Sequence, residues 1–111
     1  MYGVHLEHEC SVAVVRATGE LDAYAAPELV STLEDLSGEP RILADLSAVS
    51  FLDSTALGVL ARAVRTFGAS GSRVRVVLPT GSARRIFEIT TLDRALPVAA
   101  TRSDALAELD R

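Results

Sequence analysis

The chain is poor in cysteine, has no excess of positive charge and contains no long hydrophobic run. Its single cysteine, Cys10, can form neither an internal disulfide nor a thiolate metal site, so we expect a reduced thiol that is buried or half-buried. The formal net charge of −4 argues against binding to nucleic acid or to an anionic membrane, because both need a basic face. No segment reaches the roughly 18 to 20 apolar residues of a membrane span, and the first residues do not form a signal peptide. We therefore expect a cytoplasmic protein with no metal or redox role.

What the chain does contain is the composition of a small globular domain. Of its 111 residues, 49% are hydrophobic and 23% are charged, a balance typical of folded rather than disordered chains. A chain of this length buries roughly two-thirds of the surface that its unfolded form exposes. We therefore expect a single domain over residues 1–111.

Hydrophobic periodicity predicts strands that alternate with helices. The expected strands cover residues 4–9, 11–18, 41–46, 73–78 and 96–98, and Pro97 confines the last of them to a sheet edge. The expected helices follow Pro27, begin at Ser54, begin at a cap formed by Ser82, and run from about Ser103 to Leu109. Strands separated by helices favour parallel pairing. The order ββαβαβαβα therefore predicts an α/β fold with a four- to five-stranded mixed, mostly parallel sheet and helices packed on it.

The junction in residues 43–60 joins a buried strand to a helix through three small polar residues. These are Asp53, Ser54 and Thr55. The first amides of a helix lack intrahelical partners, and the positive end of the helix dipole lies there, so a hydroxyl or an anion is favoured. We expect the function to reside at this junction.

Ser54 has three possible roles. A serine at a helix start is most often a cap. A nucleophile needs a base, yet the only histidines, His5 and His8, lie on the first strand, and no G-x-S-x-G turn surrounds Ser54. A phosphoacceptor would carry a charge of about −1.5 to −2 at the positive end of a helix, which stabilises the helix by roughly 0.3 to 1 kcal/mol. Phosphorylation would then leave the fold intact, and any inhibition would act on a partner.

The helix that begins at Ser54 is expected to present an outward face that is small near its start and cationic near its end. Residues three and four apart share a helix face, which aligns Ser54 with Gly58 and Arg62 and brings Arg65 close. A glycine inside a helix costs about 0.5 to 1 kcal/mol relative to alanine. Either another protein approaches the backbone at Gly58, or this glycine avoids a clash with a neighbouring strand.

Five segments along almost the whole chain resemble one protein family. They are D-L-S at 45–47, F-L-D-S-T-A-L-G-V-L at 51–60, G-E-L-D at 19–22, A-P-E-L at 26–29 and R-R-I-F-E-I-T-T-L at 84–92. A strand that ends in D-L-S, followed by F-[ML]-D-S-[ST]-G-L-G-x-L, is typical of the STAS-domain anti-sigma-factor antagonists. Each segment alone is a weak signal, but their combination in this order is specific.

The resemblance implies a STAS fold and a partner-switching function. In this family the unphosphorylated antagonist binds a serine kinase that is also an anti-sigma factor, which frees a sigma factor; phosphorylation of the serine after the aspartate ends the binding. The resemblance therefore implies a phosphate on Ser54, with Thr55 as the alternative acceptor, and a phosphatase that removes it. It implies no enzymatic activity and no cofactor in this chain. ATP and magnesium would belong to the kinase, because no phosphate-cradling glycine loop is present.

The resemblance also implies a partner-binding surface around Ser54. Its residues would be Asp22, Asp53, Ser54, Thr55, Gly58, Arg62 and Arg65. Asp53 would shape or cap the helix start, whereas Asp22 either lines the same surface or only caps the helix that follows it. Two positions depart from the family pattern: Ala56 and Thr91 stand where glycine is usual. A partner that packs against the first of these glycines would bind less well to a chain with Ala56.

Two other functions remain open. An unswitched STAS accessory or scaffold subunit, in a transporter or stress-signalling complex, would bind its partner without an effect of ATP. A serine hydrolase would react with a serine-directed probe.

Overall fold

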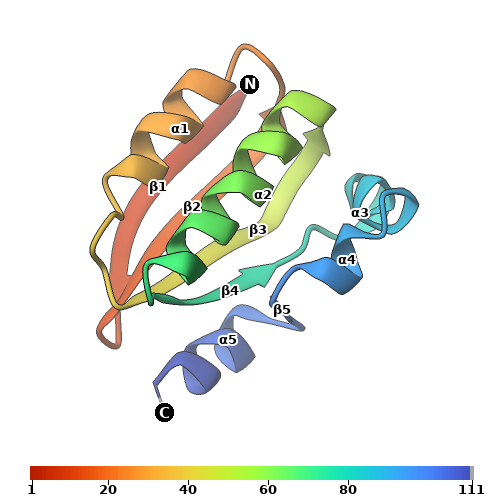
Figure 1. Cartoon of the computed structure of the whole chain (residues 1–111). Coiled ribbons are helices and arrows are strands. Elements are labelled where there is room, and N and C mark those ends of the chain that lie inside the picture. The colour runs from red at the N-terminus through yellow and green to blue at the C-terminus, as the bar shows by residue number, and fades with distance from the viewer. Residues whose placement is uncertain (111) are drawn as a thin grey trace.

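Five strands form one sheet in the order β1-β2-β3-β4-β5, in a computed structural model that describes residues 1–110 (Figure 1). Arg111 lies outside the described residues. Only β1 and β2 pair antiparallel; the other three pairs are parallel. The elements in chain order are β1 Tyr2–Glu9, β2 Val12–Leu21, α1 Ala26–Glu34, β3 Arg41–Leu52, α2 Ser54–Ala69, β4 Arg73–Val77, the 3₁₀ helix η1 Gly81–Arg84, α3 Arg85–Ile89, α4 Leu92–Ala95, β5 Val98–Ala99 and α5 Arg102–Leu109. The predicted mixed, mostly parallel α/β sheet is confirmed.

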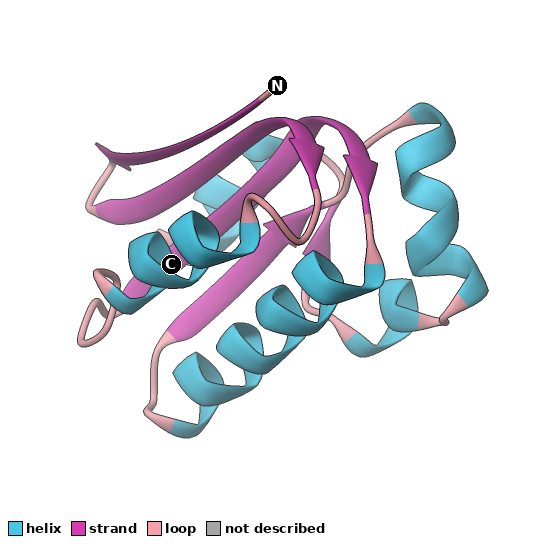
Figure 2. Ribbon diagram, turned by 90° about the horizontal axis from the view of Figure 1, so that it is seen from above, coloured by secondary structure: helices cyan, strands magenta, loops and turns pink. Residues whose placement is uncertain are grey.

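Helices cover both faces of this sheet. Successive residues of a strand point to opposite faces, so Ala13 and Val15 of β2 pack in the larger core with α1 and α2, whereas Val12 and Val14 pack in a smaller core under α5. All four side chains are buried. Figure 2 shows α1 and α2 on the same face of the sheet. Among residues 1–110, every helix is too short or too polar to span a lipid bilayer.

Strands β2 and β3 run further than the sequence pattern predicts. They end at Leu21 and Leu52, whereas the expected ends are at residues 18 and 46. In the extra part of β3, Ser47 and Ser50 are exposed, and register shifts interrupt the pairing of β2 with β3. Such shifts break the alternation by which a strand is recognised. With these ends, β2 stops directly before Asp22 and β3 stops directly before Asp53.

The D-L-S segment has a structural role. Asp45 is only 4% exposed. One of its carboxylate oxygens accepts hydrogen bonds from the amide and the hydroxyl of Ser47, at 3.0 and 2.7 Å. The other lies 3.3 Å from the guanidinium of Arg102, which begins α5 and also contacts Glu7 and Glu9 at 3.1 and 2.9 Å. This segment therefore connects the middle of the sheet to the C-terminal helix.

Two other expectations about local structure are wrong. Ser82 caps no helix: η1 follows Thr80, which makes no side-chain cap bond, and the expected single helix is divided into η1, α3 and α4. Cys10 is exposed rather than buried. It forms a two-residue turn with Ser11 between β1 and β2, and both residues have positive φ angles of 53° and 66°, as type I′ hairpin turns require. The tip of such a turn points into solvent.

Candidate functional site

Asp53 caps α2 and ties its start to the loop before α1. One carboxylate oxygen accepts the amide hydrogen of Ala56 at 3.0 Å, and the other accepts that of Ala23 at 2.9 Å. The amide of Asp53 itself donates to the carbonyl of Leu21 at 3.1 Å. Its backbone is extended, as at most N-caps, and its negative charge lies at the positive end of the helix dipole. Asp53, not Ser54, is therefore the cap of this helix.

Ser54 is the first residue of α2 and is exposed, and Thr55 beside it is exposed as well. Within residues 1–110 the Ser54 hydroxyl makes no hydrogen bond. The interpretation of Ser54 as a helix cap is therefore wrong. The hydroxyl is free to be approached by another protein.

No base serves Ser54 within the described residues. His5 lies on β1 with its Nε2 atom beside Gly3. His8 lies further along the same strand, with its Nε2 atom 3.6 Å from Glu39. Residues 1–110 also contain no group of three histidine, cysteine or acidic side chains that could hold a metal ion. The site therefore offers a hydroxyl without the machinery that would make it a nucleophile.

The outward face of α2 has the composition expected from the sequence. Arg62 and Arg65 are exposed and make no ion pair within residues 1–110. Gly58 is half-buried, and a methyl group added there would meet only the guanidinium of Arg62, at 3.9 Å. The interpretation that Gly58 avoids a clash with a strand is therefore wrong. Nothing within residues 1–110 requires a glycine at this position.

Asp22 shapes the turn between β2 and α1. One of its carboxylate oxygens accepts the amide hydrogens of Tyr24 and Ala25, at 3.0 and 3.1 Å. The cap position of α1 itself is Ala25, which makes no side-chain cap bond. The aspartate therefore organises the turn that leads into the helix, and its place on a partner-binding surface remains a prediction.

Ala56 does not lie on the surface of the site. It is completely buried under the first turn of α2. A protein that docks on the outward face of this helix cannot touch the Ala56 methyl group. The expectation that this departure from the family pattern weakens partner contact is therefore not supported by its position.

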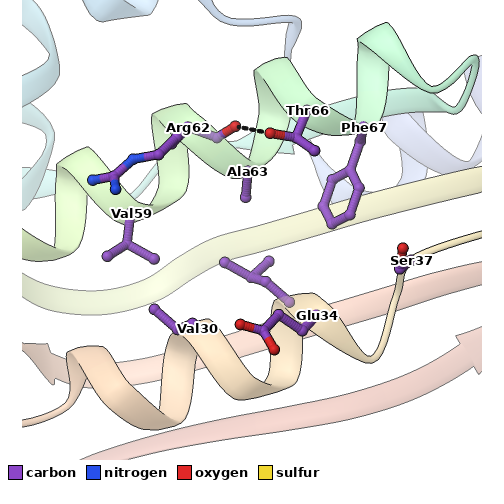
Figure 3. A pocket seen from close by; sticks show the side chains of 9 residues that line it. Val30, Glu34, Ser37, Val59, Arg62, Ala63, Thr66 and Phe67 are labelled. Atoms are coloured by element: carbon purple, nitrogen blue, oxygen red, sulfur yellow. Dashed lines mark hydrogen bonds between the residues drawn. The ribbon is translucent and has the colours of Figure 1, made fainter.

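Sequence reasoning missed two features near α2. The ring of Tyr24 is 83% exposed and lies edge-on to Tyr2, with the ring centroids 6.4 Å apart. A groove of about 530 Å³ separates α1 from α2, and Figure 3 shows side chains from both helices along it. Its walls carry Glu34 from α1 and Arg62 from α2. Neither feature has a local sequence signal, because each depends on how the helix and loop pack.

Comparison with known proteins assigns the fold to a family. The STAS domain model matches residues 4–105. The anti-sigma-B factor antagonist of Staphylococcus aureus is 32% identical over 80 residues, which cover 70% of this chain and 74% of that protein. The crystal structure of an anti-sigma factor antagonist from Mycobacterium paratuberculosis superposes with a TM-score of 0.88 at 32% identity, over 100% of this chain and 96% of that one. SpoIIAA in its unphosphorylated form shares the fold, with a TM-score of 0.77 at 23% identity over 96% of this chain and 95% of its own. The chain therefore belongs to the family of STAS-domain anti-sigma-factor antagonists.

Proposed function

We propose that this protein is an anti-sigma-factor antagonist that works by partner switching. In the unphosphorylated state it binds a serine kinase that is also an anti-sigma factor, and so frees a sigma factor. Phosphorylation of Ser54 ends the binding, and a phosphatase restores it. The observation that carries this proposal is the exposed Ser54 hydroxyl, which makes no hydrogen bond to residues 1–110 because Asp53 already caps α2. A serine that capped the helix would lose its cap bond on phosphorylation, whereas this one loses nothing.

The phosphate acts on the partner rather than on the fold. It lies at the positive end of α2, which is favourable, and one residue from the Asp53 carboxylate, which is unfavourable. Because these two effects oppose each other, the change in the free energy of unfolding is small. A doubly charged group in the middle of a binding surface, in contrast, must be desolvated or repelled by the partner.

The outward face of α2 provides the contacts. Gly58 lets the backbone of the kinase approach closely, while Arg62 and Arg65 provide positive charge further along the helix. Thr55 lies beside Ser54, and Asp22 and Asp53 shape the adjoining turns. The chain contributes the acceptor hydroxyl, and the kinase contributes ATP and magnesium. The role is that of a regulatory binding protein in the cytoplasm rather than an enzyme.

The test is to incubate the protein with ATP and the serine kinases encoded in neighbouring operons, and to measure intact mass and binding. We expect one added phosphate, none on Ser54→Ala, and one on the matched control Thr55→Ala. Ser54→Ala should still bind the kinase, and Ser54→Asp should bind at least about tenfold more weakly, which corresponds to 1.4 kcal/mol. A kinase that binds equally well after complete phosphorylation of Ser54 would contradict the switch. Binding that ATP does not affect would instead indicate an unswitched scaffold.

A further inference from the structure

Two apolar surfaces are exposed on either side of Ser54. Tyr24 is 83% exposed in the loop before α1; Phe51 near the end of β3 is 49% exposed, and Ile89 at the end of α3 is 73% exposed. Neither hydrophobic core includes any of these three side chains. Aromatic and large aliphatic groups that cluster on a surface mark interaction sites more often than isolated ones do.

Tyr24 is held close to Ser54 by hydrogen bonds of the backbone. The amide of Ala23 donates to Asp53 at 2.9 Å, and the amide of Tyr24 donates to Asp22 at 3.0 Å. Figure 1 shows that α1 and α2 begin at the same end of the sheet. The Tyr2 ring packs against the Tyr24 ring in a T-shaped arrangement, at an interplanar angle of 71°. The ring is therefore presented in a defined place and not on a loose loop, which reduces the entropy lost on binding.

Phe51 reaches the surface on the other side of the α2 start. It lines a cavity of about 300 Å³ together with Ile86, Ile89 and Arg85. Because Phe51 precedes Asp53 by two residues, this cavity adjoins the helix start. It offers a shallow apolar recess with a cation at its rim.

The two surfaces differ in the charge beside them. Glu20 and Asp22 line the recess at Tyr24, whereas Arg85 lines the cavity at Phe51 and Ile89. Arginines outnumber acidic residues in the stretch 54–94. Arg62, Arg65 and Arg85 are all exposed, and none makes an ion pair within residues 1–110. Exposed arginines without an internal partner favour a partner whose own surface is acidic.

We propose that the kinase binds two apolar anchors, one on each side of Ser54. The first anchor is Tyr24, and the second is formed by Phe51 and Ile89. The matching surface of the kinase has one apolar recess for each anchor and is acidic where it faces Arg62, Arg65 and Arg85. Aromatic side chains and arginines are the residues that contribute most to binding in protein interfaces. The phosphate on Ser54 then lies between two desolvated contacts, where water cannot screen it. This inference rests on the proposed function, because its occupant is the kinase that phosphorylates Ser54.

The test measures the affinity of that kinase for Tyr24→Ala, for Phe51→Ala and for Ile89→Ala. Leu6→Ala is the matched control, since Leu6 is 43% exposed in the middle of β1, away from the α2 start. We expect each anchor variant to weaken binding at least about tenfold and the control to leave it unchanged. Binding by the wild type should also weaken as salt is raised, because charges near the rim are screened. Thermal unfolding of each variant establishes that its fold is intact.

Three outcomes would overturn the two-anchor surface. If Ser54→Asp abolishes binding while the anchor variants bind as the wild type does, the proposed function holds and the anchors are wrong. If Leu6→Ala weakens binding as much as Tyr24→Ala, the effect is not specific to the surface around Ser54. If the wild type alone dimerises in sedimentation and Phe51→Asp is monomeric, a second copy of this chain is the occupant instead. If Ser54→Asp and the wild type bind equally, the proposed function itself fails.

Discussion

Asp53 and Ser54 divide two tasks at the start of α2. The aspartate accepts the amide hydrogens that the helix start leaves free, and the serine keeps its hydroxyl available. A short carboxylate suits the first task because it adds negative charge at the positive end of the dipole. A neutral exposed hydroxyl suits the second, because under the proposed function it gains charge only on phosphorylation. In the proposed function, the two neighbouring residues thus separate stability from regulation.

Gly58 lowers stability, and no contact in the described part of the chain requires a glycine there. We predict that Gly58→Ala raises the free energy of unfolding by about 0.5 to 1 kcal/mol, because the new methyl group meets only the guanidinium of Arg62. The same variant should bind the kinase several-fold more weakly if the partner backbone approaches there. Urea denaturation and binding titrations measure the two effects.

Gly68 provides the control for this prediction. It lies in the same helix, and a methyl group added there meets no atom within 4 Å. Gly68→Ala should stabilise the helix in a similar way and leave binding unchanged. Equal affinities of the kinase for the two glycine variants would show that Gly58 has no role in the contact.

Thr91 is strained by its backbone conformation. Its φ angle is 57°, and it directly follows Thr90, which is the C-cap of α3. This position after a helix end favours glycine, because a β-branched residue is strained in the left-handed region. We predict that Thr91→Gly raises the free energy of unfolding by about 1 kcal/mol. Chemical denaturation checks the value, and Thr90→Gly, at a φ of −86°, should destabilise instead.

At the scale of elements, two long strands place the loop before α1 next to the start of α2. β2 and β3 are parallel neighbours, and Leu21 pairs with Leu52 at their ends. The residues that follow, Asp22 and Asp53, therefore leave the sheet side by side. The loop before α1 and the start of α2 become one surface through the bond from Ala23 to Asp53. The carboxyl end of a parallel sheet, where such loops meet, is the usual place of a functional site in α/β folds.

Asp53 holds these two elements together, and its removal should weaken both. We predict that Asp53→Ala lowers the free energy of unfolding by about 1 to 3 kcal/mol, because the helix loses its cap and the Ala23 amide loses its acceptor. Hydrogen exchange of the Ala23 amide should become faster in the same variant. Ser54→Ala is the control and should change stability by less than about 0.5 kcal/mol. An Ala23 amide that stays protected in Asp53→Ala would show that the loop does not depend on this bond.

On the scale of the whole molecule, a charged cluster connects the second face of the sheet to α5. Arg102 contacts Glu7, Glu9 and Asp45, which come from two different strands, and Arg16 contacts Glu7 at 3.0 Å. The hydrogen bonds from Arg16 and then from Arg102 lower the pKa of Glu7 below its usual value. The cluster therefore depends on the ionised form of this carboxylate.

This cluster predicts how stability depends on pH. A carboxylate whose pKa is lower in the folded state stabilises the protein above its unfolded pKa, which is about 4.5, and this stabilisation is lost as the pH falls through the folded value. We predict that the free energy of unfolding decreases below about pH 4.5 and that Glu7→Gln makes this decrease shallower. Denaturant titrations between pH 7 and pH 3 measure both curves. Identical slopes for the variant and the wild type would exclude a role for Glu7.

The order of elements and the strand-to-helix junction at Asp53 could be predicted because both depend on local patterns. Apolar residues three and four apart identify α2, and the polar residues from Asp53 to Thr55 mark its start whatever the rest of the chain does. The ends of β2 and β3 could not be predicted, because the register shifts between them involve two strands at once. The division of the segment after β4 into η1, α3 and α4 could not be predicted either, because it also depends on contacts with other parts of the chain.

The sequence by itself determined the α/β class, the order of its elements and the junction at Ser54, since periodicity, capping residues and motif spacing are properties of neighbouring residues. Only the tertiary structure decided which side chain caps α2, because Asp53 finds one of its two hydrogen-bond partners in a loop thirty residues earlier. It also decided that Cys10 and Tyr24 are exposed and that Ala56 is buried. Burial and hydrogen bonding depend on residues distant in the chain, and these contacts exist only once the sheet and its helices have assembled.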